Sequence, residues 1–174
     1  MRIAVGDLPD KPLHLVGTVE VALAGGGEKD VPVVREPVAY DLKVFKQESS
    51  VLVEGRVEAV VEAPCSRCAQ RFPIVVDRRF SELFAAVNER EGVPSTELDG
   101  DDLDLDYYEG DAIDGLQLLA EQIILELPMK ILCAEDCRGL CPKCGADLNH
   151  ADCDCEAYVD PRWASLKGLL RDQL

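Results

Sequence analysis

Histidine is scarce in this chain, with only His14 and His150 among 174 residues. Hydrolytic zinc sites keep an open position for water, usually among histidine and carboxylate ligands. Neither His-x-Glu nor His-Glu-x-x-His occurs, and Gly-x-Ser-x-Gly, Gly-x-x-x-x-Gly-Lys and Gly-x-Gly-x-x-Gly are also absent. The last three motifs belong to serine hydrolases, phosphate-binding loops and dinucleotide-binding folds. We therefore expect a protein that is not an enzyme and has no small-molecule substrate.

Basic side chains are outnumbered, because 18 lysines and arginines face 34 aspartates and glutamates, for a formal charge of −16. Such a field repels phosphate, so binding of nucleic acid over the whole surface is disfavoured and a basic protein partner is favoured. No apolar run approaches the ~20 residues that span a bilayer. Residues 1–7 carry no apolar core or cleavage site of a secretory signal. We expect a cytoplasmic protein that does not enter a membrane.

Eight cysteines are present, and all of them fall in closely spaced pairs: Cys65 with Cys68, Cys133 with Cys137, Cys141 with Cys144, and Cys153 with Cys155. Two sulfurs on one tight turn can bind the same ion, so such pairs are typical of tetrahedral zinc–thiolate sites. Disulfides need an oxidising compartment, a thioredoxin-like centre needs one pair opening a helix, and iron–sulfur ligation usually uses tighter runs of cysteines. The spacing therefore predicts one or two structural Zn²⁺ ions.

The eight thiols can be divided in more than one way. In the first partition Cys65 and Cys68 join Cys133 and Cys137, while the other four cysteines close a local site within residues 141–155. In the second, the two Cys-x-x-Cys pairs share one ion. A third possibility is a single ion, with Cys153 and Cys155 free. We prefer the first, because a short local loop loses little entropy on closure. His150 is the one substitute ligand in that loop.

Alternating apolar and charged residues predict strands over 15–23, 38–45, 51–62 and 72–80. The glycines at 25–27 and the polar residues 47–50 supply turns. Cys65 and Cys68 then lie in the turn between two strands. An antiparallel sheet or open barrel follows.

Residues 91–114 are predicted to be an acidic linker, since positions 97–114 hold nine acidic residues and no basic one. We interpret this segment as solvated, and the alternative is a docking strip for a basic partner.

A helix is predicted from Asp114, whose side chain can cap it, with Gln117 in the capping-box position and Pro128 as the stop. Its apolar stripe is expected to cover the sheet and comprises Leu116, Leu119, Ala120, Ile123, Ile124 and Leu127. A short last helix is predicted from Asp160 and Pro161, with Trp163, Leu166, Leu169 and Leu170 as its apolar face.

The fold class is therefore α+β, in three parts. Residues 1–90 form the β domain with the first cysteine pair, 91–114 the acidic linker, and 115–174 the covering helix, a cysteine-rich zinc lobe and the short C-terminal helix.

Four arginines gather around the first cysteine pair and the strand after it: Arg67, Arg71, Arg78 and Arg79. They are candidates for contacts with RNA or a protein partner. We favour the alternative that they balance the acidic residues of the sheet and the thiolates.

The ordered combination of these features resembles the YceD family of bacteria and plastids. It consists of a β-rich first half with Cys65 and Cys68, an acidic stretch, a helix ending in Leu-Glu-Leu-Pro-Met-Lys, the segment from Cys133 to Asn149, and a closing Asp-Pro-Arg-Trp-Ala. The resemblance implies a non-enzymatic role in accumulation or processing of large-subunit (23S) ribosomal RNA and in ribosome assembly. The acidic charge then suggests binding to a basic ribosomal or processing protein, with at most local RNA contact. The alternative function is a thiol-based redox sensor or chaperone that releases zinc on oxidation.

Overall fold

The structure, a computed structural model, describes residues 1–23, 31–48, 50–87, 105–155 and 162. The predicted C-terminal helix from Asp160, apart from residue 162, lies outside these residues, and so do the glycine-rich turn and the first part of the acidic segment, up to residue 104. No helix in the described part of the chain is long and apolar enough to cross a membrane.

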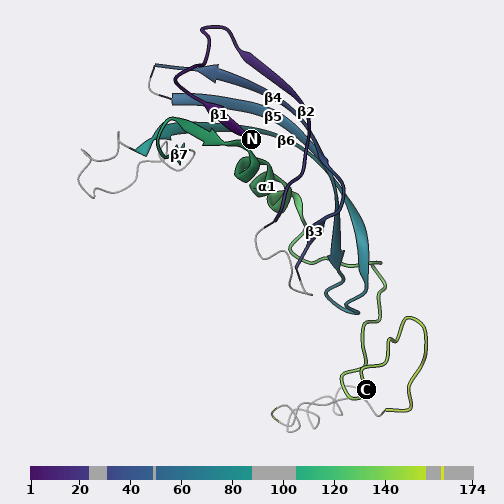
Figure 1. Cartoon of the computed structure of the whole chain (residues 1–174). Helices are drawn as coiled ribbons and strands as arrows, with labels where there is room; N and C mark the ends of the chain where they lie inside the picture. The colour runs from purple at the N-terminus through teal and green to yellow at the C-terminus, as the bar shows by residue number, and fades with distance from the viewer. Residues whose placement is uncertain (24–30, 49, 88–104, 156–161, 163–174) are drawn as a thin grey trace, which may run out of the picture.

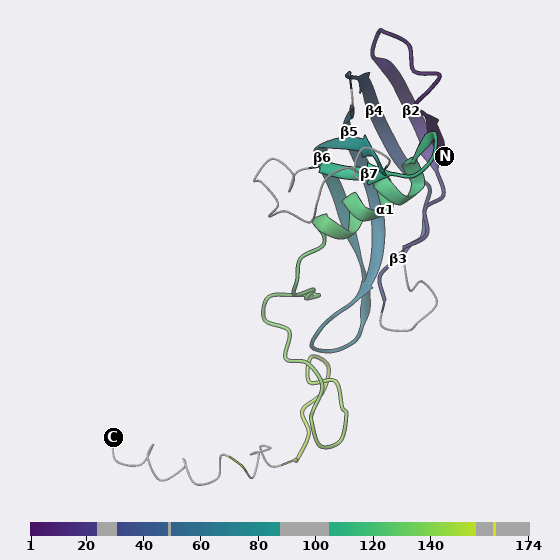
Figure 2. The same ribbon diagram turned by 90° about the vertical axis from the view of Figure 1, so that its left-hand side faces the viewer.

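The described residues form an α+β structure in which one arched sheet carries a single helix (Figures 1 and 2). The large sheet has the strand order β2-β4-β5-β6-β7, with β3 paired to β5, and a small second sheet pairs β1 with β8. The elements are β1 (Arg2–Ala4), β2 (Leu13–Val19), β3 (Val33–Val34), β4 (Val38–Lys46), β5 (Ser50–Pro64), β6 (Arg71–Ala86), β7 (Leu105–Tyr108), β8 (Ala112–Asp114) and α1 (Gly115–Glu126).

The four predicted strands are confirmed as β2, β4, β5 and β6, and each pairs antiparallel with its neighbour. The prediction of a wholly antiparallel sheet is wrong at one place, because β7 runs parallel to β6. A parallel pair needs a crossover connection of a dozen residues or more, and residues 87–104 provide that length. Strands β7 and β8 also lie in the segment that the sequence suggested as a linker, so seven of its last ten residues belong to the sheets.

The long β5–β6 hairpin contributes many of the buried residues of the core. Val53, Val57 and Val61 are buried on the face of β5 toward α1, while Glu54 and Glu58 are exposed on the other face. The register runs from Ser50 opposite Ala85 to Pro64 opposite Arg71. Strand β5 therefore keeps an apolar face toward α1, whereas the same face of β6 combines Val76, Phe80 and Phe84 with Arg78 and Glu82. The hairpin tip carries Cys65 and Cys68 away from the helix.

Helix α1 begins where the sequence predicts. The Asp114 side chain accepts hydrogen bonds from the backbone N–H groups of Leu116 at 2.9 Å and Gln117 at 3.3 Å. The reciprocal half of a capping box is not formed, because the Gln117 amide instead donates to Glu121 Oε1 at 2.8 Å. The helix ends before Leu127 and Pro128, as expected.

The buried face of α1 differs from the predicted stripe. Leu118 and Gln122 are buried together with Leu119 and Ile123, whereas Ile124 is 45% exposed. Gln122 escaped prediction because an amide counts as polar in any hydropathy pattern. Its side chain accepts from Arg78 Nε at 2.8 Å and donates to Glu82 Oε1 at 2.9 Å. This bonding offsets the cost of burying the amide between helix and sheet.

The side chains of Leu42 and Phe80 fill the space beside Gly55, so we expect Gly55→Ala to destabilise the fold by about 1–3 kcal/mol through overpacking. A β-carbon there would overlap Leu42 Cδ2 and would lie 2.8 Å from Phe80 Cζ. Gly6→Ala is the matched control, since a β-carbon at Gly6 meets nothing within 4 Å. Denaturant unfolding measures both, and equal stability of the two variants would contradict this packing.

Candidate metal centres

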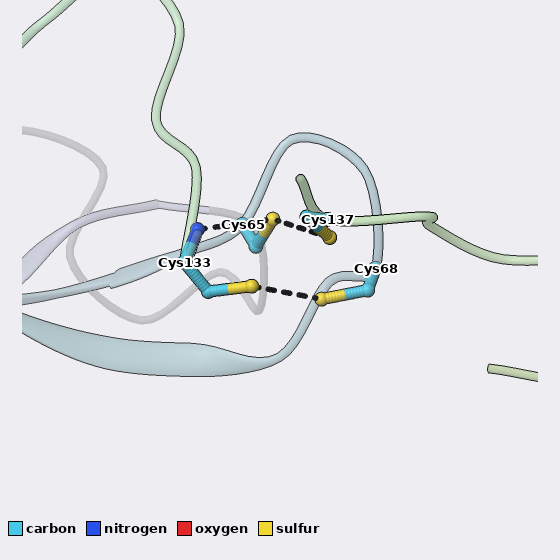
Figure 3. Close-up of side chains that lie close together, drawn as sticks. All are labelled: Cys65, Cys68, Cys133 and Cys137. Carbon is cyan, nitrogen blue, oxygen red and sulfur yellow. Dashed lines mark hydrogen bonds between the residues drawn. The ribbon is translucent and has the colours of Figure 1, made fainter. Parts of the chain in front are cut away.

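The turn between β5 and β6 brings Cys65 and Cys68 against Cys133 and Cys137, which follow α1 in sequence (Figure 3). We call these four residues the inner centre. Their sulfur atoms all lie within 4.8 Å of one another, with 3.7 Å between Cys65 and Cys137 and 3.7 Å between Cys68 and Cys133. A backbone hydrogen bond of 2.7 Å from Ser66 N to Ile131 O holds the two segments together.

The sulfur spacing of the inner centre has the size that a tetrahedral zinc–thiolate site requires. Sulfurs in a disulfide are about 2.05 Å apart, and all eight cysteines are free. Four sulfurs at about 2.3 Å from a central zinc ion are about 3.8 Å from one another. The observed 3.7 Å separations match that value, so the donor set and its spacing could hold a metal ion.

The remaining four cysteines form a second group, Cys141, Cys144, Cys153 and Cys155, whose sulfurs also lie within 4.8 Å of one another. We call it the outer centre. The grouping into two sets of four matches the first partition and not the second, in which the two Cys-x-x-Cys pairs share one ion. His150 is exposed and lies outside both groups, with Nε2 at 3.7 Å from Asp147 Oδ2.

The two Cys-x-x-Cys turns have the same backbone hydrogen bonds. Cys65 O accepts from Ala69 N at 2.9 Å, and Cys141 O accepts from Gly145 N at 2.9 Å. The first cysteine of each turn also donates its backbone N–H to the carbonyl five residues later. Cys65 N donates to Gln70 O at 2.9 Å, and Cys141 N donates to Ala146 O at 2.8 Å. Ala69 and Gly145 both adopt left-handed backbone conformations, with φ of 59° and 74°.

Backbone N–H groups around each first cysteine favour its thiolate. Burial acts to raise the pKa of Cys65, but N–H groups of Cys68, Cys133 and Arg67 outweigh it and lower the pKa to about 6. In the outer centre the N–H groups of Cys144 and Lys143 likewise lower the pKa of Cys141 to about 6.

The last thiols to ionise show the opposite effect. Hydrogen bonding with the neighbouring sulfur of Cys137 raises the pKa of Cys133 to about 12, and Cys144 does the same for Cys155. Four thiols this close cannot all ionise at neutral pH by themselves. A cation that neutralises the thiolates would allow all four to do so.

The centres differ in burial. Cys65, Cys68 and Cys137 are buried at the inner centre, whereas Cys144 and Cys155 are exposed at the outer one. The outer centre is therefore the more accessible to chelators and oxidants.

The four arginines do not form one patch. Arg67 Nη1 donates to the backbone carbonyls of Cys137 at 2.7 Å and Glu135 at 3.2 Å, and Arg71 Nε bonds Glu62 at 2.7 Å. Arg78 faces α1, where it bonds Gln122 and Glu126. Three of the four thus serve internal contacts.

Arg79 is exposed on the opposite face of β6, and among the described residues it has no hydrogen bond or ion pair. It is therefore the one arginine of the group with its guanidinium available for a partner.

One residue at the centres escaped the sequence analysis as a contributor. Asn149 Nδ2 donates to Cys137 Sγ at 3.4 Å. Its place inside the loop of the outer centre was the only signal, and no ligand-spacing rule points to an amide.

A family model described as large ribosomal RNA subunit accumulation protein YceD matches residues 53–170, which is more than half of the chain. The chain belongs to the YceD family. The matched region contains both centres and all of the β5–β6 hairpin except the first three residues of β5.

Several curated proteins are similar to this YceD-family chain. An uncharacterized protein of Mycobacterium tuberculosis, Rv2926c, is 32% identical over 130 residues, covering 75% of this chain and 60% of the relative. The chloroplastic large ribosomal RNA subunit accumulation protein YCED homolog 1 of Zea mays is 27% identical over 194 residues, covering 98% of this chain and 66% of the relative. Bacillus subtilis YlbN is 33% identical over 110 residues, covering 62% of this chain and 59% of the relative. The chain spans about three fifths of the length of the mycobacterial relative. No solved structure matches this chain significantly.

The left-handed residues of the two turns give a matched pair of substitutions with opposite expected signs. Gly145→Ala should destabilise the protein by about 1 kcal/mol, because an alanine there is strained and no new contact compensates. Ala69→Gly should stabilise it by up to about 1 kcal/mol, since Ala69 is exposed and its methyl group is not packed in the core. Unfolding midpoints under reducing conditions measure both, and changes of the same sign would contradict this account of the turns.

Proposed function

We propose that this YceD-family protein is a non-catalytic zinc-binding factor that promotes accumulation of large-subunit ribosomal RNA by binding a basic ribosomal or processing protein in the cytoplasm. The observation that carries the proposal is the family match, whose described role concerns the large ribosomal RNA subunit and whose range includes all eight cysteines.

The chemistry of the donor set supports structural zinc. Each centre offers four thiolates, the ligands of closed structural sites, and such a site has no position for water or substrate. At the inner centre zinc would join the tip of the β5–β6 hairpin to the segment after α1. These segments are about 65–72 residues apart in sequence, so the ion would supply folding energy there.

Charge supports a basic protein as the partner. The formal charge is −16, and loading two zinc ions on eight thiolates changes it by −8 and +4, to −20. A groove of about 540 Å³ lies where β7, β8 and the start of α1 meet. Its acidic lining residues are Asp106, Glu109, Asp114 and Glu121, with Arg2 as the basic exception and Tyr107 and Tyr108 beside them. A lysine- or arginine-rich segment complements this lining in charge and can stack on the tyrosine rings.

Exposure of Cys144 and Cys155 favours a second candidate, a redox-sensing or chaperone protein that releases zinc on oxidation. The two functions differ in which partner binds and in the redox condition under which it binds. Affinity capture under reducing conditions should recover a basic ribosomal or processing protein if the protein is an assembly factor. Capture of unfolded clients only after oxidation would support the second function instead.

Charge removal in the groove tests the proposed partner directly. The triple variant Asp106→Asn, Glu109→Gln, Glu121→Gln should slow association with the captured basic protein by about 10-fold at low ionic strength, because steering by charge acts on the association rate. Its salt dependence should also flatten. The control removes three exposed carboxylates elsewhere, with Glu20→Gln, Glu48→Gln and Glu54→Gln.

Equal rates in the groove variant and the control would contradict docking at the groove. Direct RNA binding predicts another pattern, in which the groove variant binds RNA more tightly and Arg79→Ala binds it more weakly.

A further inference from the structure

The two centres are joined by a very short segment. Only Arg138, Gly139 and Leu140 separate Cys137 of the inner centre from Cys141 of the outer centre. Leu140 N donates to Arg67 O at 3.1 Å, and Leu148 N donates to Gly139 O at 2.9 Å. A β-carbon at Gly139 would lie 3.0 Å from Arg67 O. The short segment is therefore packed directly against the first cysteine turn, and the loop of the outer centre is hydrogen-bonded to that segment.

Asn149 lies in that loop, between the two cysteine pairs of the outer centre, but its side chain contacts the inner centre. Its Oδ1 accepts from the backbone N–H of Arg138 at 2.7 Å, and its Nδ2 donates to Cys137 Sγ at 3.4 Å. A backbone N–H can only donate, so this bond fixes which end of the amide faces the sulfur. Nδ2 also donates to Asp147 Oδ1 at 2.7 Å.

We propose that Asn149 couples the two centres, so that metal binding at the outer centre tightens metal binding at the inner centre. This inference rests on zinc binding as proposed above. Closure of the loop by the outer four sulfurs positions the amide, and the amide then donates a hydrogen bond to a sulfur ligand of the inner centre. Bonds to metal-bound thiolates are charge-assisted and fix the ligand's orientation. By linkage the coupling is reciprocal, so the inner ion also favours the outer one.

Few other contacts can hold the loop in place when the outer centre is empty. Among the described residues the loop contacts the segment before it through Leu148 and Asn149, through the Arg138–Asp152 ion pair at 2.7 Å, and through the Leu140–Asp147 bridge. Arg138 and Asp152 are both exposed, so their pair contributes little. A metal at the outer centre would add to these contacts by closing the loop at both of its cysteine pairs, and would so restrict where Asn149 lies.

Asparagine suits this position because the side chain there must accept one hydrogen bond, from Arg138 N, and donate another, to Cys137 Sγ. Aspartate has nearly the same shape but cannot donate, and it would place a negative charge beside a thiolate. Asn149→Asp should therefore weaken the inner centre more than Asn149→Ala does.

The test is competitive zinc titration of the full chain against a chelator under reducing conditions, repeated with Co²⁺ to record the sulfur-to-metal charge-transfer bands. Asn149→Ala should raise the inner dissociation constant about 10-fold, within the range for lost outer-shell partners. His150→Ala is the matched control and should leave it unchanged. Removing the outer centre with Cys144→Ser and Cys155→Ser should raise the inner constant by a similar factor, a result that does not depend on the folding of any Asn149 variant.

The decisive result comes from combining the changes. In the Cys144→Ser, Cys155→Ser background, Asn149→Ala should have no further effect, because the amide is no longer positioned there. A further 10-fold loss in that background, or an inner constant unaffected by removal of the outer centre, would overturn the coupling while leaving zinc binding intact. A chain that binds no zinc at all would refute the proposed function itself.

Discussion

The structure depends most on the need to place four sulfurs around one point at the tip of the β5–β6 hairpin. Thiolates 3.7 Å apart repel one another, and hydrogen bonding with Cys137 holds the pKa of Cys133 at about 12. Backbone N–H groups can stabilise one negative charge, on Cys65, but not four. A bound cation would resolve the conflict and would tie the end of the sheet to the chain that leaves α1.

This constraint also explains the arrangement around the centre. Arg67 donates hydrogen bonds to the backbone carbonyls of Glu135 and Cys137. The turn that supplies Cys65 and Cys68 therefore also holds the segment that supplies the other two cysteines of the inner centre. Asn149 adds a contact from the outer centre. The cysteine-rich lobe is in this way bonded to the hairpin tip, while α1 packs on the same sheet nearer its middle (Figure 1). The acidic groove lies at the start of α1, built from β7, β8 and the helix, so the metal centres and the proposed docking surface use different parts of the molecule.

Much of this fold could be predicted from local sequence. Period-two burial in β5 and β6 and the cap at Asp114 depend on neighbouring residues, and close cysteine pairs indicate which residues could share an ion. Three features could not be predicted. The parallel pairing of β7 depends on how the chain returns to the sheet, and burial of Gln122 depends on Arg78 and Glu82 from a distant strand. The bond from Asn149 to Cys137 depends on how the loop of residues 141–155 folds back toward the inner centre. Each of these is set by tertiary contacts that no local pattern encodes.

The central claim is that two closed four-thiolate zinc sites organise this protein. X-ray absorption at the zinc edge, with zinc content measured on the same sample purified without added metal, tests it most directly. The account predicts about two zinc ions per chain, each with four sulfur neighbours at about 2.3 Å and no nitrogen or oxygen neighbour. A zinc content near one, or a nitrogen or oxygen ligand at about 2.0 Å, would contradict it.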